Sequence, residues 1–465
     1  MTAIVTSKFR TLNAENFKDD INTPVSGSSV FVAIGKTDAW SNAVSDTTDA
    51  EPFTPYDTID SLVESRENMF ALKKLNAADV SHVVPRHTWT TGTSYVRWDS
   101  NDADMFDYAF YVITSEFKVY KCIFSPATGS TQEPTQTLTS PTAESDLYIW
   151  KYMYTVAVAD AEKFLTTSYM PVKTINVETY GNDAAAEAAL SEGDYAQYLN
   201  QKASRDSSTA AGIERIEVVT GGTGYTSAPS VYVTGAGTGA TATATVSGGS
   251  VTAIAVTAKG TDYSTVHIKI EGGGGSDAAA RAVLSPENGH GTDPVKELGG
   301  FFSAVNTLLD GSGGGDLTVG NDFRQITLVK NPFNFGTSVV STSATLKATP
   351  ALSFSATTSS FVVDELITQG SGATLAQAYV VEVDSGTGYI HYQQNSKTGY
   401  GNFVPGTAVV GGTSGAQGTP KTTVSAFVIS PEVDVHSGDV IFLENRNPID
   451  RTASQIEDIK IIIEF

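Results

Sequence analysis

The chain is organised around its C-terminal stretch Ser437-Gly-Asp-Val-Ile-Phe-Leu-Glu-Asn-Arg-Asn-Pro-Ile449, which continues to Ile459-Lys-Ile-Ile-Ile-Glu-Phe465. The apolar run from Val440 to Leu443 follows Gly438-Asp439 and predicts a short strand that is buried on both faces. Pro448 has no N–H and keeps Asn447 out of the helical region, so a turn is predicted over residues 445–448.

The last seven residues predict a second strand that is apolar on one face. Its large apolar side chains alternate with Lys460 and Glu464, and in a strand alternate side chains share a face: Ile459, Ile461, Ile463 and Phe465. A chain end this apolar has to be tied into a core. We therefore expect the partners of this closing hairpin to lie far upstream.

Length and composition indicate a multi-domain protein that is mainly β with an α+β core. A chain of 465 residues exceeds what one hydrophobic core usually supports, which predicts two to four domains. With 40% apolar and 17% charged residues it has the composition of a folded protein. Glycine, threonine, serine, alanine and valine are abundant and long helical periodicities are scarce, which favours strands.

The charge balance excludes some partners. The 51 acidic and 29 basic side chains give a formal charge of −22, which argues against nucleic-acid binding and against anionic membranes. The single cysteine, Cys122, excludes an intramolecular disulfide framework and a cysteine-based zinc site. No apolar run reaches the length of a signal peptide or a membrane span, so we expect synthesis in a reducing cytosol.

Residues 1–204 are predicted to form the N-terminal part of the core. Helical spacing of apolar residues predicts a helix between Asp57 and Leu75. Residues 110–124 and 147–158 predict long alternating strands, and an alanine-rich helix is expected from Asp183 to about Gln201. The second strand carries aromatic side chains on one face, which predicts a core or a buried protein interface: Tyr148, Trp150, Tyr152 and Tyr154.

Two modules are predicted within this core. The first, residues 205–290, contains a repeat with a period of 38, in which Gly222-Thr-Gly-Tyr225 matches Gly260-Thr-Asp-Tyr263. Residues 291–335 continue the core with an alternating strand at Asp322–Pro332. The second module, residues 336–430, holds a hairpin around Ser385-Gly-Thr-Gly388, and residues 431–465 supply the C-terminal core strands.

Several blocks, taken in order, resemble the baseplate wedge subunit of T4-type contractile-tailed phages, the gene-product-eight family. They cover residues 1 to about 200, 295–335 and 430–465: Ala3–Thr11, Ile34–Trp40, Val83–Trp89, Tyr120–Cys122, Tyr148–Val156, Phe323–Pro332 and Ser437–Ile449. No block is diagnostic alone, but seven in the same order make chance resemblance improbable. The two modules have no counterpart in the T4 protein.

The resemblance implies a homodimer without enzymatic activity that joins other wedge subunits, resides in the virion and is assembled in the bacterial host cytoplasm. Further baseplate proteins or the host surface are expected to meet the chain through the two modules. The residues of the matching blocks become structural or interface candidates: Lys8, Phe9, Arg10, Trp40, Pro85, Arg86, Trp89, Trp150, Phe323, Arg324, Asn331, Pro332, Glu444, Asn445, Arg446 and Pro448. Their arginines and Lys8 fit subunit contacts and loop contacts within the monomer equally well.

No catalytic, cofactor or metal site is predicted. His82 and His87 are five residues apart across Pro85, which is not a metal-ligand spacing. Gly272-Gly-Gly-Gly-Ser-Asp277 fits one half of a calcium β-roll repeat but lacks the tandem copies such a site needs. Two alternatives stay open: a receptor- or glycan-binding tail protein that uses the modules, and a polysaccharide depolymerase, which would show a long β-helix array.

Overall fold

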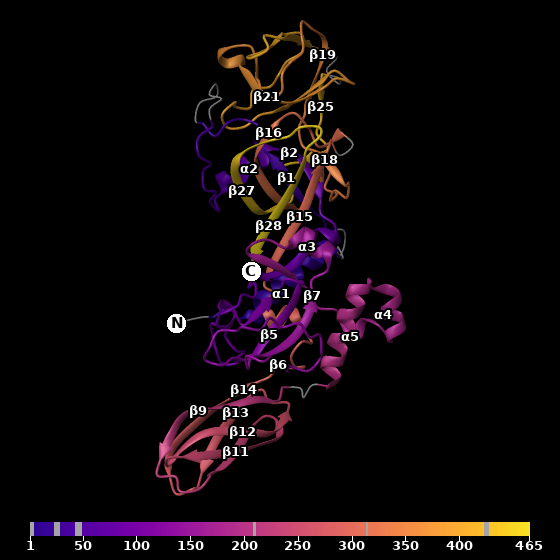
Figure 1. The fold of residues 1–465 in the computed structure, drawn as a ribbon. Helices are drawn as coiled ribbons and strands as arrows, with labels where there is room; N and C mark the ends of the chain where they lie inside the picture. Colours follow the sequence, from indigo (N-terminus) through magenta and orange to yellow (C-terminus); the bar gives the residue numbers. More distant parts are fainter. Residues whose placement is uncertain (1–3, 23–27, 42–48, 208–210, 313–314, 423–426) are drawn as a thin grey trace. The chain divides into compact units, whose positions relative to one another are not determined.

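The computed structural model describes residues 4–22, 28–41, 49–207, 211–312, 315–422 and 427–465 (Figure 1). The fold is mostly β and contains several sheets, as the sequence predicts. The chain divides into two compact units. Unit 1 comprises residues 1–15, 81–304 and 462–465, and unit 2 comprises residues 16–80 and 305–461.

The body of unit 1 is built on an antiparallel sheet with the order β4-β5-β7-β6. Its strands are β4 (Tyr111–Ile113), β5 (Lys118–Phe124), β6 (Thr142–Ala143) and β7 (Ile149–Thr155). The single long strand predicted over residues 110–124 is wrong, because Phe117 adopts a φ of 57° and the chain reverses there into a hairpin. The left-handed backbone at Phe117 is uncommon for a non-glycine residue, and no sequence signal marks it.

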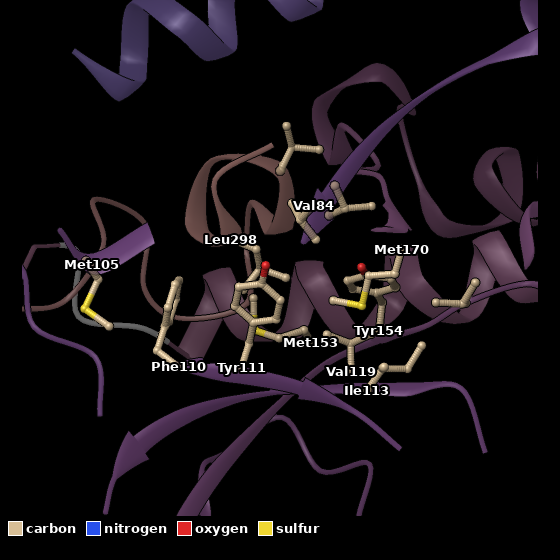
Figure 2. Packing of buried hydrophobic residues seen from close by; sticks show 13 residues of the cluster. Val84, Met105, Phe110, Tyr111, Ile113, Val119, Met153, Tyr154, Met170 and Leu298 are labelled. Atoms are coloured by element: carbon tan, nitrogen blue, oxygen red, sulfur yellow. The ribbon is translucent and has the colours of Figure 1, made fainter. Parts of the chain in front are cut away.

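Both faces of this sheet are buried. On one face Tyr111, Val119, Met153 and Tyr154 pack with Leu298 and Met170 (Figure 2). On the other face Tyr148 and Trp150 stack, with ring centroids 5.6 Å apart and planes 12° apart. The prediction of one shared aromatic face is wrong at Tyr154, because a register shift between β5 and β7 turns this side chain to the opposite face from Tyr148 and Trp150. Tyr148, Trp150 and Tyr154 are all buried, as a core strand requires, and Tyr152 is half-buried.

Helices and short strands complete the body of unit 1. The strand β3 (Val80–Pro85) pairs antiparallel with β8 (Tyr169–Val172). The helix predicted over residues 183–201 is two helices, α4 and α5. The remaining elements that lie wholly or partly in this unit are α1 (Ser7–Asn22), η3 (Met105–Asp107), α3 (Val158–Phe164), η4 (Val177–Thr179), α4 (Asp183–Ala189), α5 (Glu192–Ser207) and α6 (Pro294–Leu298).

The residues with the 38-residue period form one six-stranded sheet with the order β13-β10-β11-β12-β9-β14 (Figure 1). Its strands are β9 (Ile213–Thr223), β10 (Ser230–Gly235), β11 (Thr238–Ser247), β12 (Ser250–Thr261), β13 (Val266–Glu271) and β14 (Ser276–Leu284). The two repeats interleave: β9 of the first pairs with β14 of the second, and β12 of the second pairs with β11 of the first. At the centre Ile216 lies opposite its own equivalent, Ile254.

Unit 2 contains a five-stranded sheet with the order β18-β2-β1-β16-β27. The predicted core strand at residues 322–332 is confirmed as the buried strand β16 (Asp322–Lys330), paired with β1 (Val30–Gly35). The predicted helix over residues 57–75 is only partly correct. It ends as α2 (Ile59–Asn68), and β2 (Met69–Lys74) follows directly and pairs with β1 and with β18 (Thr345–Lys347). The 3-10 helix η2 (Ala77–Asp79) leads out of this sheet.

The C-terminal stretch differs from its prediction in three ways. β27 (Asp439–Asp450) is continuous through Pro448, so the predicted turn is wrong. Its apolar run is not buried on both faces, since the Ile441 side chain is 42% exposed. β27 and β28 (Ile456–Glu464) belong to different sheets, so they form no hairpin.

The upstream partners of these two strands are confirmed. β27 pairs antiparallel with β16, and β28 lies beside β15 (Phe302–Asp310) in a sheet with the order β28-β15-β3-β8. Ile459 and Ile461 are buried and Ile463 is half-buried, as their alternation predicts. Glu464, on the opposite face, is exposed.

A seven-stranded sheet with the order β22-β21-β20-β23-β24-β19-β25 lies further along unit 2. Its strands are β19 (Ala351–Thr357), β20 (Leu366–Gln369), β21 (Ala376–Asp384), β22 (Tyr389–Gln393), β23 (Val409–Gly411), β24 (Gln417–Pro420) and β25 (Val428–Ile429), with the 3-10 helix η6 (Gly372–Thr374). The predicted hairpin is confirmed, because Asp384 pairs with Tyr389 across the turn. The short strand β17 (Phe333–Asn334) precedes this sheet in the sequence, and the short strand β26 (Val433–Asp434) follows it. The two strands pair with each other.

Candidate functional site

The body of unit 1 encloses a cluster of charged side chains. Lys121 on β5 is fully buried, and its ammonium lies 2.9 Å from an Oε2 of Glu297 on α6 and 3.8 Å from the centre of the Trp98 ring. Burial lowers the pKa of Lys121, and the Glu297 carboxylate opposes this change. The arrangement places a cation between a carboxylate and an aromatic face, where each interaction is stronger than in water.

Glu297 organises the loop that precedes its own helix. Its Oε1 accepts hydrogen bonds from the backbone N–H groups of Gly291, Thr292 and Asp293, at 2.8, 3.0 and 3.2 Å. Four donors, counting Lys121, therefore converge on one buried carboxylate. Such saturation is what a buried charge requires to be stable.

Two further titratable groups border this pair. The Lys151 ammonium on β7 donates to the Ser204 hydroxyl on α5 at 2.9 Å, and burial lowers the pKa of Lys151 to about 8. The imidazole of His290 lies 3.7 Å from Glu214 and 3.9 Å from Glu297, and its side chain is 7% exposed. Burial, reinforced by the nearby Lys121 charge, lowers the pKa of His290, so its neutral form is favoured.

Charged side chains also join the six-stranded sheet to the body of unit 1. Arg281 on β14 binds Asp99 and Glu217, and Arg215 on β9 binds Glu217 at 2.7 Å. The Trp98 indole N–H donates to the Leu284 carbonyl at 3.2 Å. Positive and negative groups alternate, so this junction is fixed by a network and not by one pair.

Seven of the family-block residues lie in unit 1. Lys8 and Phe9 on α1 are exposed, whereas Arg10 binds Glu464 and the Phe465 carbonyl and lies 3.6 Å from the Phe301 ring centre. Pro85 ends β3, and Arg86 donates to the Thr166 carbonyl at 2.9 Å. The indole of Trp89 donates to Ser130 at 3.1 Å, and Trp150 is buried.

The other nine lie in unit 2, and the structure brings several of them together. Arg324 on β16 binds Asp49 through two nitrogens, at 2.7 and 2.8 Å, and donates to the Thr37 carbonyl. The buried Trp40 donates to the Arg446 carbonyl at 2.7 Å. Asn445 joins the Phe53 carbonyl to Gln325.

The remaining members are separate from this group. Phe323 is buried, and Asn331, with a φ of 55°, accepts from the Ser29 N–H just before Pro332. Glu444 pairs with Arg446 at 3.3 Å on the surface, and Pro448 is exposed. Arg10, Arg86 and Arg324 thus make contacts within the chain, while Lys8, Phe9, Glu444 and Arg446 lie at the surface.

A groove of about 310 Å³ lies beside β27. Its walls are the apolar part of β27 and the start of α2 with its preceding loop: residues 440–443, Pro55, Tyr56, Asp57 and Leu62. Two of the residues that line the groove, Tyr56 and Ile441, are exposed apolar side chains. β27 is the outermost strand of its sheet, so this apolar groove adjoins a sheet edge.

Sequence reasoning missed the buried cluster around Lys121. Its members come from β5, β7, β9, α6 and the loop at His290, and the two members of the central pair are 176 residues apart. One signal was available: Lys121 and Lys151 both interrupt aromatic strands. In the described parts of the chain, no cluster of three or more metal-ligating side chains occurs and no helix could span a membrane.

Comparison with known proteins locates a relationship in the first third of the chain. Residues 3–144 match the family model described as Bacteriophage T4, Gp8. Over 132 residues the chain is 29% identical to the baseplate wedge protein gp8 of Enterobacteria phage T4. This alignment covers 27% of the chain and 39% of that relative. Resemblance at residues 295–335 and 430–465 stays a prediction. The N-terminal part of the chain is similar to the gp8-type family of phage baseplate wedge proteins.

Proposed function

We propose that this chain is a structural subunit of the baseplate wedge of a contractile-tailed bacteriophage and that it carries no enzymatic activity. The observation that carries the proposal is the match of residues 3–144 to the gp8 family. That relationship supports a structural role in a phage baseplate and residence in the virion tail. Synthesis and assembly in the cytoplasm of the bacterial host belong to the same proposal.

The contacts of the family-block residues support a scaffold role. Arg10 ties α1 to the last two residues of the chain, and Arg324 ties β16 to Asp49. The bidentate Arg324–Asp49 pair holds two segments in one geometry, because the guanidinium and the carboxylate are both planar. We propose that these ties keep each unit rigid while the surface side chains contact other subunits.

We propose that the chain is a homodimer and that the groove beside β27 contacts the second copy. The groove combines exposed apolar side chains with the surface pair Glu444–Arg446, and a two-fold contact needs such a self-complementary mixture. Ile441→Arg would place a charge at the centre of that contact. Val219→Arg, on β9, is a matched control because Val219 is also exposed.

Light scattering after size exclusion tests this surface. We expect a dimer for the unmodified chain and for Val219→Arg, and at least a tenfold weaker dimer for Ile441→Arg, which corresponds to about 1.4 kcal/mol. An unchanged dimer in Ile441→Arg would place the contact elsewhere.

We further propose that residues 205–290 and 336–430 contain modules inserted into a discontinuous core. In the second range the module is the seven-stranded sheet, because β18, which precedes it, pairs with β2 in the five-stranded core sheet. Gly212 and Ser285 are hydrogen-bonded neighbours, so the chain leaves and rejoins the body of unit 1 at one place. In unit 2 the pairing of β17 with β26 brings residues 334 and 433 together. Insertions at such points lengthen surface loops at little cost in stability. We propose that the modules contact further baseplate proteins or the host surface.

Reconstitution tests the proposed function as a whole. The purified chain is mixed with the other candidate wedge proteins of its phage, and the mass is measured by light scattering. We expect a dimer that enters a larger complex on mixing. A trimer that ignores those proteins would overturn the wedge proposal and favour a tail-spike or adhesin.

A further inference from the structure

Unit 2 contains a cavity of about 300 Å³, which is separate from the groove beside β27. It lies where the end of α2, the end of β22, the segment before β19 and the segment after β26 meet. Side chains of five kinds face it: Glu67, Met69, Tyr392, Gln393, Tyr400 and His436. Its volume is at the lower end of the range for sites that take small molecules.

The walls of the cavity are held in place by hydrogen bonds. The Arg66 guanidinium donates to the carbonyls of Val435, Ser437 and Gly438 at 3.1, 2.7 and 2.7 Å, which fixes the wall that carries His436. The Gln393 side-chain amide donates to the Glu67 carbonyl at 2.8 Å and joins β22 to α2. A site held this way is preformed, so a ligand does not have to order it.

An aromatic ring stands at the mouth of the cavity. Tyr400 is 57% exposed, yet its hydroxyl donates to Glu67 Oε2 at 2.5 Å. Carboxylate and hydroxyl thus hold the exposed ring in one position. An exposed ring that is held still presents an apolar face with a polar edge, which suits the C–H face of a sugar ring.

The polar groups of the cavity complement hydroxyl groups. The Gln393 side-chain oxygen has no hydrogen-bond partner among the described residues, but it is buried away from the open space, so the residue serves the cavity as part of its wall. Among the lining residues, Glu67 supplies an acceptor and His436 supplies a group that can donate or accept. No lysine or arginine is among the described residues that line the cavity, so these residues offer no positive charge that would favour an anionic ligand.

We propose that this cavity binds a neutral saccharide unit, with Tyr400 as the stacking platform and Glu67 and His436 as hydrogen-bonding groups. The proposal does not depend on the wedge assignment, because a scaffold subunit can carry a sugar site. It assigns a chemical class of ligand to one place in unit 2.

Saturation-transfer NMR with D-glucose, D-galactose and N-acetylglucosamine tests the proposal on the full chain. We expect transfer to at least one of the three at about 10 mM sugar, which would nearly saturate a site with a Kd of about 1 mM. Tyr400→Ala should weaken binding about fivefold or more by removing the aromatic platform. Tyr232→Ala, at an exposed tyrosine on β10, should leave binding unchanged.

Glu67→Gln separates the hydrogen-bonding role from the platform. Glutamine can still accept from the Tyr400 hydroxyl but has lost one acceptor and the charge, so we expect weaker binding with the thermal midpoint unchanged. Absence of transfer for all three sugars would overturn the proposal, as would equal transfer in Tyr400→Ala. Loss of wedge-protein binding in Tyr400→Ala without any sugar transfer would identify a protein contact instead, and would leave the wedge assignment standing.

Discussion

Lys121 and Glu297 form an ion pair from which water is excluded, and the two residues depend on each other. Glu297 is also held by three backbone N–H groups, which keep its carboxylate group at the same buried place whether or not Lys121 is present. Removing one partner of such a pair costs far more than the pair contributes, because an uncompensated charge stays behind.

Lys121→Met should therefore destabilise the protein by about 3 kcal/mol or more. Urea unfolding followed by tryptophan fluorescence measures the change. Lys118→Met is the matched control: Lys118 is on the same strand, and its pair with Glu116 lies at the surface. Pairs of that kind contribute about 0–1 kcal/mol. Equal effects of the two substitutions would contradict the buried-pair argument.

The imidazole of His290 makes stability depend on pH. Its surroundings are Glu214, Glu297, Lys121 and the edge of the Trp98 ring, and burial lowers its pKa below the ordinary value near 6.5. The unfolded chain therefore takes up a proton before the folded chain does. Stability contributed by neutral His290 is complete above about pH 6.5 and is lost as the pH falls below it.

His290→Gln should reduce this loss between pH 7.5 and 5.5. A single histidine changes the free energy of unfolding by at most about 1.4 kcal/mol per pH unit. The free energy of unfolding of the variant, measured in urea, should therefore depend on pH less steeply than that of the unmodified chain, by up to this amount. His87 and His391, whose pKa values burial also lowers, keep a residual slope in both proteins. The exposed His267 provides the control, since His267→Gln should leave the slope unchanged. An unchanged slope in His290→Gln would contradict the argument.

At the scale of elements, alternation predicted strands well where a strand has neighbours on both sides. β16 and the β21–β22 hairpin agree with their patterns because their side chains meet a core. β27 did not, because Pro448 lies between Asn445 and Ile449, where the register with β16 shifts, and a proline is tolerated at such an irregularity of an outermost strand. The predicted helix over residues 57–75 failed at Met69, where four buried residues in a row fit helix and strand patterns alike.

The candidate site was predictable only in part. The strands that carry Trp150 and residues 323–332 could be predicted, because apolar side chains alternate along the sequence there. The Lys121–Glu297 pair and the Tyr400–Glu67 contact cannot be seen in the sequence, because their members are 176 and 333 residues apart, respectively. Only pairing of the sheets brings such residues together.

Excision of residues 213–284 tests the inserted-module proposal at this scale. Joining Gly212 to Ser285 through two glycines should leave the rest of the chain folded, because these residues are already hydrogen-bonded neighbours. Circular dichroism and the near-ultraviolet aromatic signal measure the fold. The excised segment, expressed alone, should give a strand spectrum. Loss of the aromatic signal in the shortened chain would mean that the six-stranded sheet belongs to the core.

At the scale of the whole molecule, the division into two compact units predicts two unfolding steps. Each unit has a buried ion pair: Lys121–Glu297 in unit 1 and Arg451–Glu457, at 2.8 Å, in unit 2. In scanning calorimetry, Lys121→Met should lower one transition, and Arg451→Met should lower the other. The Arg451 guanidinium also donates to the carbonyls of Thr318 and Gly311, so its loss leaves several groups unsatisfied. A single transition that both variants shift equally would contradict independent units.

The interleaved repeats of the six-stranded sheet determine whether the rate at which this sheet forms depends on protein concentration. β9 and β12 each pair with the last strand of the other repeat, and Ile216 faces Ile254 across an axis of internal symmetry. A chain with one repeat could complete this sheet only by meeting a second molecule, at a rate that depends on concentration. With both repeats in one chain, the encounter becomes a first-order folding step with an effective concentration in the millimolar range. Duplication of this kind makes the sheet insensitive to dilution.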